Sequence, residues 1–154
     1  MQKSILQKIT RFCAYQERTQ QEVREKLRSF KIFGEEAEEI ISYLVTENFI
    51  NEERLAISFA GGKFRTKQWG KQKIEYALRQ KHLSEHCIRK GLEAIEQTEY
   101  EQTLTELLRK KYELLTQEEP NLFLRKQKTF RYALQKGYEL DLIQKLGKGI
   151  FPRD

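Results

Sequence analysis

The sequence predicts an all-α fold of three tandem three-helix repeats that form an elongated, curved helical array. Composition is the first reason: only two prolines and eight glycines interrupt a 154-residue chain dominated by good helix formers such as Glu, Lys, Leu, Gln and Arg. Periodicity is the second reason, because apolar positions coincide when the chain is shifted by 51 residues, for example Leu27 with Leu78 and Ile41 with Leu92. Repeats of this kind bury their apolar faces against neighbouring repeats and build extended bodies.

The first repeat is expected over residues 1–49. A helix is predicted over residues 3–17, where Ile5, Ile9 and Cys13 form an apolar stripe at helical spacing. Thr19, followed three residues later by Glu22, is typical of a capping box and predicts the start of a second helix. A glycine ends that helix, and the acidic residues that follow favour a third helix over residues 35–48.

The second repeat is expected over residues 50–96. Asn51 is predicted to cap a helix that leads to a turn at residues 68–70. Inside this helix, Gly61 and Gly62 indicate either a bend or the close approach of another backbone or a ligand, since each glycine costs a helix about 1 kcal/mol relative to alanine. A helix over residues 71–81 follows, and Ser84 caps the last helix of the repeat.

The third repeat is expected over residues 97–154. Helices are predicted over residues 99–116 and 122–136, and a short one begins near residue 139 and leaves a short frayed C-terminal tail. The apolar residues expected to face inward on the middle helix are Phe123, Phe130, Ala133 and Leu134. The segment Tyr76–Leu78 recurs as Tyr132–Leu134, which suggests how this repeat aligns with the second.

Cations are concentrated in two blocks that occupy equivalent parts of the second and third repeats. The chain has a net charge of +6, with nine cations against two anions over residues 63–90 and eight against three over residues 125–154. Such a balance favours anionic partners, although each single lysine could equally belong to a solvated helix face. A base could stack on Trp69, or its ring could pack under the turn. The predicted DNA- or filament-binding residues are Lys63, Arg65, Lys67, Trp69, Lys71, Lys73, Arg79, Lys81, Arg125, Lys126, Lys128 and Arg131.

The sequence predicts no catalytic group, no cofactor and no metal site. The potential ligands His82, His86 and Cys87 are near one another, but zinc requires about four ligands. Cys13 and Cys87 both fall on apolar helical positions and are expected to be buried free thiols. The sequence has neither an apolar run that would span a bilayer nor a signal-peptide core near its start, so we expect a cytoplasmic protein without membrane contact.

Several motifs, in order, resemble those of a known family. The segment Arg18–Leu27 reads R-T-x-x-E-V-x-x-K-L, and Asn48–Ala56 reads NFINEERLA. They are followed by Arg65, Gly70 and Ile74 at matching spacing. Together these motifs resemble RecX proteins, which regulate the RecA recombinase. The resemblance covers nearly all of the first two repeats and, more weakly, the third.

The resemblance implies three three-helix repeats and a regulatory, non-enzymatic role in DNA recombination, DNA repair and the SOS response. RecX-like proteins lie in the groove of the RecA filament on single-stranded DNA and limit its ATP hydrolysis, strand exchange and stability. We therefore expect a monomer that binds the RecA filament and single-stranded DNA, with weak binding to duplex DNA. Two alternatives remain open at this point: a helix-turn-helix-like DNA-binding regulator, and a helical-repeat adaptor that binds only proteins.

Overall fold

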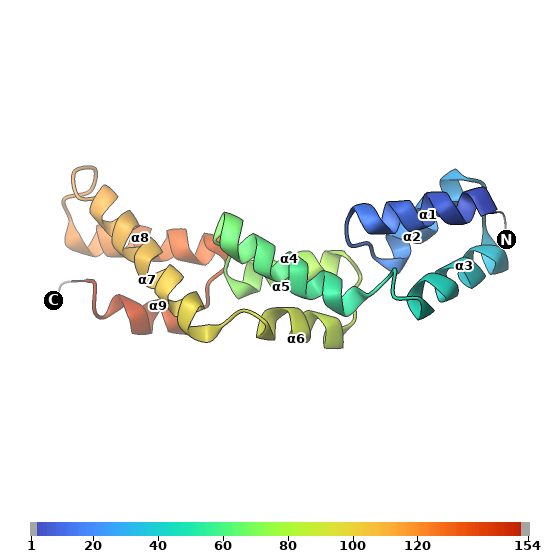
Figure 1. Cartoon of the computed structure of the whole chain (residues 1–154). Coiled ribbons are helices and arrows are strands. Elements are labelled where there is room, and N and C mark those ends of the chain that lie inside the picture. Colours follow the sequence, from blue (N-terminus) through green and yellow to red (C-terminus); the bar gives the residue numbers. More distant parts are fainter. Residues whose placement is uncertain (1–2, 152–154) are drawn as a thin grey trace.

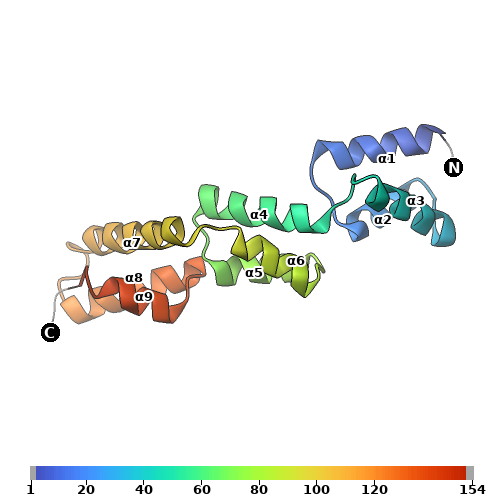
Figure 2. The same cartoon turned by 60° about the horizontal axis from the view of Figure 1, so that its bottom comes forward.

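The computed structural model describes residues 3–151, and within this range every regular element is a helix. The helices form three groups of three that follow one another along a single long axis (Figure 1). The first helices of the three groups, α1, α4 and α7, lie along the same side of the array (Figure 2). The predicted fold class, an elongated all-α array of three-helix units, is therefore confirmed.

The first unit consists of α1 (Lys3–Tyr15), α2 (Gln20–Ser29) and α3 (Gly34–Thr46). The capping box predicted before α2 is present: the backbone N–H of Glu22 donates to Thr19 Oγ1 at 3.0 Å, and the backbone N–H of Thr19 donates to Glu22 Oε1 at 3.2 Å. These bonds satisfy two backbone donors that would otherwise lack partners at the helix start. The first and third helices end two residues earlier than predicted, which is an ordinary uncertainty for helix ends.

The second unit consists of α4 (Glu52–Lys67), α5 (Lys71–Gln80) and α6 (Glu85–Glu93). Asn51 and Ser84 cap α4 and α6 through their side chains, as predicted. Helix α4 continues through Gly61 and Gly62. Within this unit, a different glycine allows a close approach between helices: a Cβ on Gly91 of α6 would lie 2.8 Å from the backbone oxygen of Ala56 on α4. Gly91 therefore allows α6 to pack directly on the backbone of α4.

The third unit consists of α7 (Gln97–Leu114), α8 (Leu122–Lys136) and α9 (Leu140–Gly147). The inward face predicted for α8 is partly wrong, because Phe123 and Leu134 are 60% and 41% exposed. Ala133 is fully buried as expected, but the rest of the buried face is formed by Arg125 and Thr129. Polar side chains can occupy this face because both of them are hydrogen-bonded.

The alignment of the third unit with the second that is based on the Tyr-Ala-Leu segment differs from the structure by one residue. His82 and Gly137 both adopt left-handed backbone conformations, with φ of 60° and 102°, and equivalent turns therefore stand 55 residues apart. This spacing places Leu78 on Ala133, and both side chains are fully buried. The repeated Tyr-Ala-Leu segment, which is spaced by 56 residues, is a coincidence of sequence and does not mark equivalent positions.

The end of the described chain is packed, in contrast to the frayed tail expected from the sequence. Phe151 is only 8% exposed, and its ring lies 5.2 Å from that of Tyr112 and 5.3 Å from that of Phe130. Pro152, which was also assigned to this tail, lies outside the described residues. The aromatic contacts close the end of the third unit's core.

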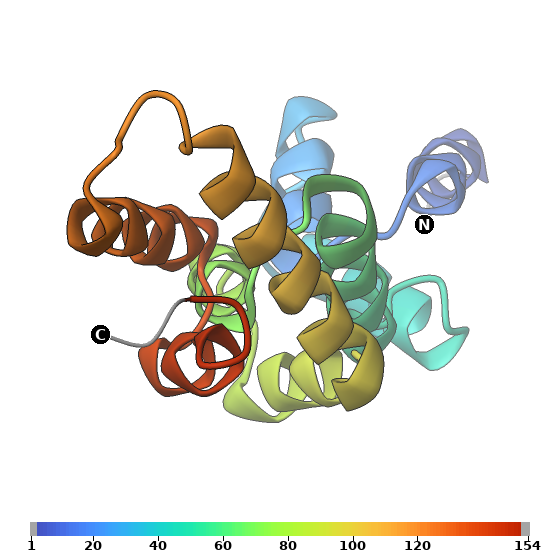
Figure 3. The same cartoon turned by 90° about the vertical axis from the view of Figure 1, so that its left-hand side faces the viewer.

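Two separate apolar cores stabilise the molecule. The first unit has its own core, which includes Cys13 and Leu27, whereas the second and third units share one continuous core. Both cysteines are free thiols, as expected; Cys13 is buried, and burial raises its pKa, while Cys87 is only half-buried. Viewed from the end of the third unit, the first unit is displaced to one side of the other two (Figure 3).

The second and third units meet through a direct contact between backbones. The backbone N–H of Gly70 donates to the carbonyl of Lys136 at 2.8 Å, and that of Gln72 donates to the carbonyl of Gly137 at 2.9 Å. A Cβ on Gly70 would lie 2.3 Å from the carbonyl carbon of Gly137, so there is no room for a side chain. This glycine–glycine junction fixes the start of α5 against the end of α8.

Gly70→Ala is expected to lower the free energy of unfolding by about 1–3 kcal/mol, because the added methyl group would force the two backbones apart. The matched control is Gly62→Ala, where an added Cβ meets nothing within 4 Å. The control should leave stability unchanged or raise it by up to about 1 kcal/mol through helix propensity. Urea unfolding followed by circular dichroism measures both effects, and equal stability of the two variants would contradict the close junction.

Candidate nucleic-acid interface

The only tryptophan in the sequence lies where the two main basic helices of the second unit meet. Helix α4 ends at Gln68 in a left-handed conformation (φ 57°), and the turn places Trp69 directly before α5. The ring is half-buried and packs against the core shared by units two and three. Lys63 Nζ and Lys73 Nζ lie 5.1 and 4.7 Å from the ring. Trp69 therefore packs under the turn and also positions two cations.

A second ring continues this arrangement toward the first unit. Phe59 of α4 has Lys63 Nζ at 5.5 Å and Lys81 Nζ at 5.0 Å from its centroid. Attraction between an ammonium group and an aromatic face is worth about 0.5–1 kcal/mol at exposed sites, which is enough to favour one side-chain position over others. Among the described residues, Lys63 and Lys73 have no ion-pair partner within 4.0 Å, so their charges remain available to an external anion. Lys81 also forms no such ion pair, but it lines hollows that include Glu17, Glu22 and Glu25 of the first unit.

A third ring extends the same pattern into the third unit. Tyr132 of α8 lies between Lys111 Nζ, at 4.9 Å, and Lys136 Nζ, at 5.9 Å. The Lys136 ammonium also donates to the backbone carbonyl of Lys67 at 3.0 Å, which places it beside the end of α4. We call this surface the cation–aromatic band, and it consists of Phe59, Lys63, Lys67, Trp69, Lys73, Lys81, Lys111, Tyr132 and Lys136.

Sequence reasoning missed four members of this band: Phe59, Lys111, Tyr132 and Lys136. Lys111 lies on α7, whose acidic residues hide it in a count of charge by segment, and the rings of Phe59 and Tyr132 add nothing to such a count. The spacing of basic residues on one helix does not reveal a cation that is contributed by the neighbouring helix. The repeat could have indicated Lys136, because it follows Lys81 by 55 residues, the same spacing that separates the equivalent turns.

The remaining predicted cations of the second unit lie outside the band or are partly neutralised. Arg65 is exposed and folds back over Gly61, where a Cβ would meet its guanidinium at 2.7 Å. Lys71 lies 4.7 Å from the Tyr100 ring at the junction of units two and three. Arg79 forms an ion pair with Glu85, which lowers the pKa of that carboxyl group, and so has less charge to offer a partner.

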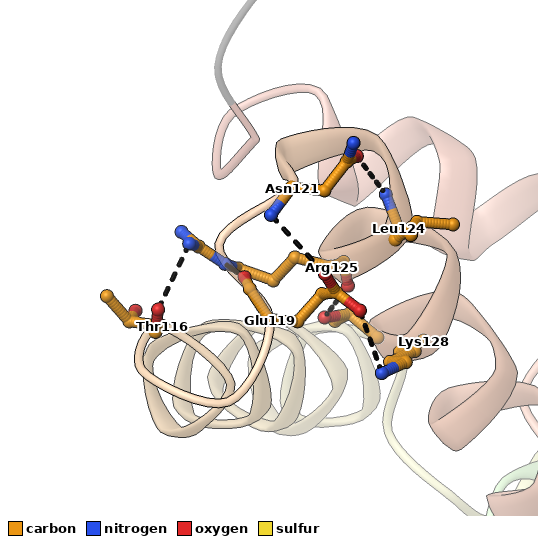
Figure 4. Close-up of polar contacts among 7 residues, drawn as sticks. Thr116, Glu119, Asn121, Leu124, Arg125 and Lys128 are labelled. Atoms are coloured by element: carbon orange, nitrogen blue, oxygen red, sulfur yellow. Dashed lines mark hydrogen bonds and ion pairs between the residues drawn. The ribbon is translucent and has the colours of Figure 1, made fainter.

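The Arg125 side chain has a structural role in the third unit (Figure 4). Its side chain is 8% exposed, and it donates to the backbone carbonyls of Glu119 at 2.9 Å and Thr116 at 3.2 Å. Lys128 forms an ion pair with the Glu119 carboxylate at 3.0 Å, which lowers the pKa of that carboxyl group. Together these contacts hold the loop between α7 and α8, which stands out at the end of the array (Figure 3).

The cations that the sequence predicts as a basic block in the third unit therefore have different surroundings in the structure. Lys126 Nζ lies 5.8 Å from the rings of both Phe130 and Phe151, near the packed end of the chain. Arg131 is exposed and has no ion-pair partner among the described residues. The structure thus brings Lys63, Lys67 and Lys73 together with the third unit, while it separates Arg125 and Lys128 from them.

The three potential metal ligands noted in the sequence do not gather around a common point. His86 Nε2 lies 3.5 Å from a carboxylate oxygen of Glu53, and its other ring nitrogen is near Arg89. Within residues 3–151, no cluster of three or more His, Cys, Asp or Glu side chains has the arrangement of a metal site. None of the helices in this range is both long enough and apolar enough to cross a membrane.

Comparison with known proteins places the two band-bearing units in one family. Residues 51–92 match the family model for the second three-helix domain of RecX, and residues 98–146 match the model for the third. The chain belongs to the RecX family. A regulatory protein RecX from Clostridium perfringens strain 13 is 32% identical over 124 residues, which is 80% of this chain and 58% of that protein. RecX from Clostridium beijerinckii is 27% identical over 137 residues, which is 89% of this chain and 63% of that protein.

Solved structures show the same fold. The crystal structure of RecX from Lactobacillus salivarius superposes with a TM-score of 0.86 at 23% identity, covering 94% of this chain and 93% of that one. A second RecX crystal structure has a TM-score of 0.80 and 22% identity. The chain thus has the RecX fold, while it spans only about three-fifths of the length of the Clostridium relatives.

Replacing Arg125 with Met should lower the free energy of unfolding by about 1–3 kcal/mol, because the α7–α8 loop would lose two hydrogen bonds from a charged donor to its backbone carbonyls. Arg131→Met is the matched control, since it removes the same charge from the exposed face of α8. It should change stability by less than about 0.5 kcal/mol. Urea unfolding provides the measurement; a loop that depends on Arg125 would also become more sensitive to proteolysis near residues 115–121. Unchanged stability of Arg125→Met would contradict this structural role.

Proposed function

We propose that this chain regulates the RecA recombinase by binding the RecA filament on single-stranded DNA and lowering its ATPase activity, strand exchange and stability. The cation–aromatic band is the observation that supports this proposal. It extends over two units, and its lysines have no acidic partners among the described residues. The proposed role is non-catalytic and cytoplasmic, and it is carried out by a monomer whose units divide after residues 49 and 96.

The geometry of the band fits a phosphate backbone better than an isolated phosphate. Its cations come from α4, α7 and α8 and from the start and end of α5, and aromatic rings beside Lys63, Lys73, Lys81, Lys111 and Lys136 limit the motion of those side chains. A row of fixed positive charges matches a polymer whose phosphates repeat along one direction. Restricting the lysine side chains before binding also reduces the entropy that they lose when phosphate contacts form.

A helix-turn-helix regulator is a weaker reading of the same units. Such a protein inserts one helix of each unit into the major groove and reads bases with exposed side chains. Helix α6, the third of its unit, packs on α4 through Gly91, and its outer face pairs Arg89 with Glu93 at 3.9 Å. The ring-bound lysines of the band lie instead on or next to the first and second helices. This arrangement favours contact with a backbone over sequence-specific reading of duplex DNA.

The direct test measures RecA activity on single-stranded DNA. Adding this chain in slight excess over the filament binding sites should lower the rate of RecA ATP hydrolysis and of strand exchange. The control is the same titration with the heat-denatured chain. If both rates stay unchanged while binding to the filament is verified by co-sedimentation, the proposed regulatory role is wrong.

The triple variant Lys63→Gln/Lys67→Gln/Lys73→Gln should weaken filament binding and reduce the salt dependence of the affinity. For single strands the logarithmic slope changes by about 0.7 for each phosphate that a cation neutralises, so removing three cations should reduce it by about 2. The control is Lys110→Gln/Lys145→Gln/Lys148→Gln, which removes equal charge from exposed positions outside the band. Fluorescence anisotropy at several salt concentrations measures both variants, and matching slopes would contradict a role for the band.

A further inference from the structure

The first unit contains a hollow between α1 and α2 whose lining differs from the unit's overall charge. The first fifty residues carry equal numbers of cations and anions, so a count of charge predicts no basic surface there. Among the described residues, the lining nevertheless includes four cations and three aromatic rings and no acidic side chain. We call it the α1–α2 hollow, and it is lined by Lys8, Arg11, Phe12, Tyr15, Arg18, Lys26 and Phe30.

The cations in this hollow are arranged over the rings. The Arg18 guanidinium lies 3.7 Å from the centroid of Phe12 and donates to the backbone carbonyl of the same residue at 3.0 Å. Lys26 Nζ lies between two rings, 5.3 Å from Phe12 and 5.6 Å from Phe30. Lys8 approaches Phe30 from the other helix, at 5.7 Å. The hollow is therefore built on the same cation–aromatic contacts as the band.

The α1–α2 hollow and the part of the band in the second unit occupy equivalent positions in their repeats. At several of these positions a cation in one unit is replaced by an aromatic residue in the other. The shift of 51 residues holds in the structure, since Lys31 and His82 adopt the same left-handed conformation (φ 62° and 60°) after equivalent helices. At four positions one unit has a cation where the other has a ring. The exchanged pairs are Lys8 and Phe59, Phe12 and Lys63, Arg18 and Trp69, and Phe30 and Lys81.

Two of the contacts persist although the partners have changed places. Lys8 of the first unit faces the ring of Phe30, and in the second unit Lys81 faces the ring of Phe59 at 5.0 Å. In the same way, Arg18 lies over the Phe12 ring in the first unit. At the equivalent positions of the second unit, Lys63 Nζ lies 5.1 Å from the Trp69 ring. What both units retain is a surface of cations between rings, rather than a particular side chain at a particular place.

Packing alone does not account for the number of cations in the hollow. One cation on each ring would be enough to cover the edge of the core, yet four cations share the hollow and repel one another. The acidic side chains of the unit line other surfaces: Glu35, Glu36 and Glu38 lie on α3, while Glu17, Glu22 and Glu25 line hollows shared with the second unit. Glu38 is paired with Arg24 at 2.9 Å and so is not available to the hollow. A bound polyanion would remove the repulsion.

Tyr15 indicates which polyanion fits. Its ring is 83% exposed at the rim of the hollow, and the Arg18 guanidinium lies 5.9 Å from it. An exposed ring beside cations offers a surface on which an unstacked base can lie while its phosphates contact the cations. Bases in duplex DNA are stacked on one another and are not available for this contact.

We propose that the α1–α2 hollow is a further binding surface for single-stranded nucleic acid, separate from the cation–aromatic band. Phosphates contact Lys8, Arg11 and Lys26, and a base stacks on Tyr15. This inference extends the proposed function to the first unit and relies on it for the kind of nucleic acid involved. The first unit thus adds contacts along the same strand that the other two units bind.

The test uses the 154-residue chain and fluorescein-labelled oligo(dT) without recombinase, so that it is independent of any effect on RecA. Lys8→Gln/Arg11→Gln/Lys26→Gln should lower affinity at least tenfold at low salt and reduce the logarithmic salt slope by about 2. The matched control, Lys3→Gln/Arg28→Gln/Lys31→Gln, removes the same charge from exposed positions of the same unit outside the hollow. Identical affinities and slopes for the two variants would overturn the proposal.

A second comparison tests stacking and does not depend on charge. Tyr15→Ala should weaken oligo(dT) binding about tenfold, within the range that loss of one base–aromatic stack produces. Tyr43→Ala, on the acidic helix of the same unit and 38% exposed, should leave binding unchanged. Circular dichroism melts establish that both variants fold. Equal binding by Tyr15→Ala and Tyr43→Ala would overturn the assignment of the base contact.

The outcomes separate this inference from the proposed function. If the hollow variants lose oligo(dT) affinity and the unmodified chain leaves RecA activity unchanged, the hollow is supported and the regulatory proposal is wrong. If the hollow variants bind oligo(dT) like their controls but lose affinity for RecA in the absence of DNA, the hollow contacts protein, and the nucleic-acid assignment is overturned.

Discussion

The close contact between Gly70 and Gly137 is the constraint on which the proposed binding surface depends. It joins the start of α5 to the end of α8 through backbone hydrogen bonds of 2.8 and 2.9 Å. Tyr100 strengthens the junction: its hydroxyl donates to Glu139 at 2.6 Å and accepts the backbone N–H of Lys71 at 2.8 Å. Burial, together with the hydrogen bond to Glu139, raises the pKa of Tyr100, so the phenol stays protonated and keeps its donor. Without this junction, the lysines of units two and three would not form one band.

The junction between the first two units is of a different kind. Its side-chain contacts are polar: Arg54 pairs with Glu17 at 2.7 Å, and the backbone N–H of Gln20 donates to Glu52 at 2.9 Å. The apolar cores on the two sides remain separate. Partly exposed ion pairs contribute little to stability, so this junction resists bending less than the glycine–glycine junction. The first unit is therefore joined to the second by weaker contacts than those that join the second to the third.

The candidate site could be predicted only in part, because the sequence shows how many cations there are and not what each one contacts. The concentration of charge around Trp69 pointed to Lys63 and Lys73, and in the structure both ammonium groups lie near its ring. A charge count gave the same weight to Arg125, which the structure shows buried and bonded to two backbone carbonyls. It gave no weight to the first unit, because the acidic residues on α3 offset the cations of the hollow in the net charge of the unit. In the structure those acidic residues do not line the hollow.

The sequence by itself determined where most helices begin, because capping is a local interaction between neighbours: Thr19, Asn51 and Ser84 each accept a backbone N–H three residues later. It also determined the fold class, since the repeated apolar spacing requires stacked helices. The tertiary structure alone decided which face of α8 is buried and how the third unit aligns. Those outcomes depend on contacts between residues far apart in the chain, such as the glycine junction. The local sequence pattern does not reveal the free energy of such contacts.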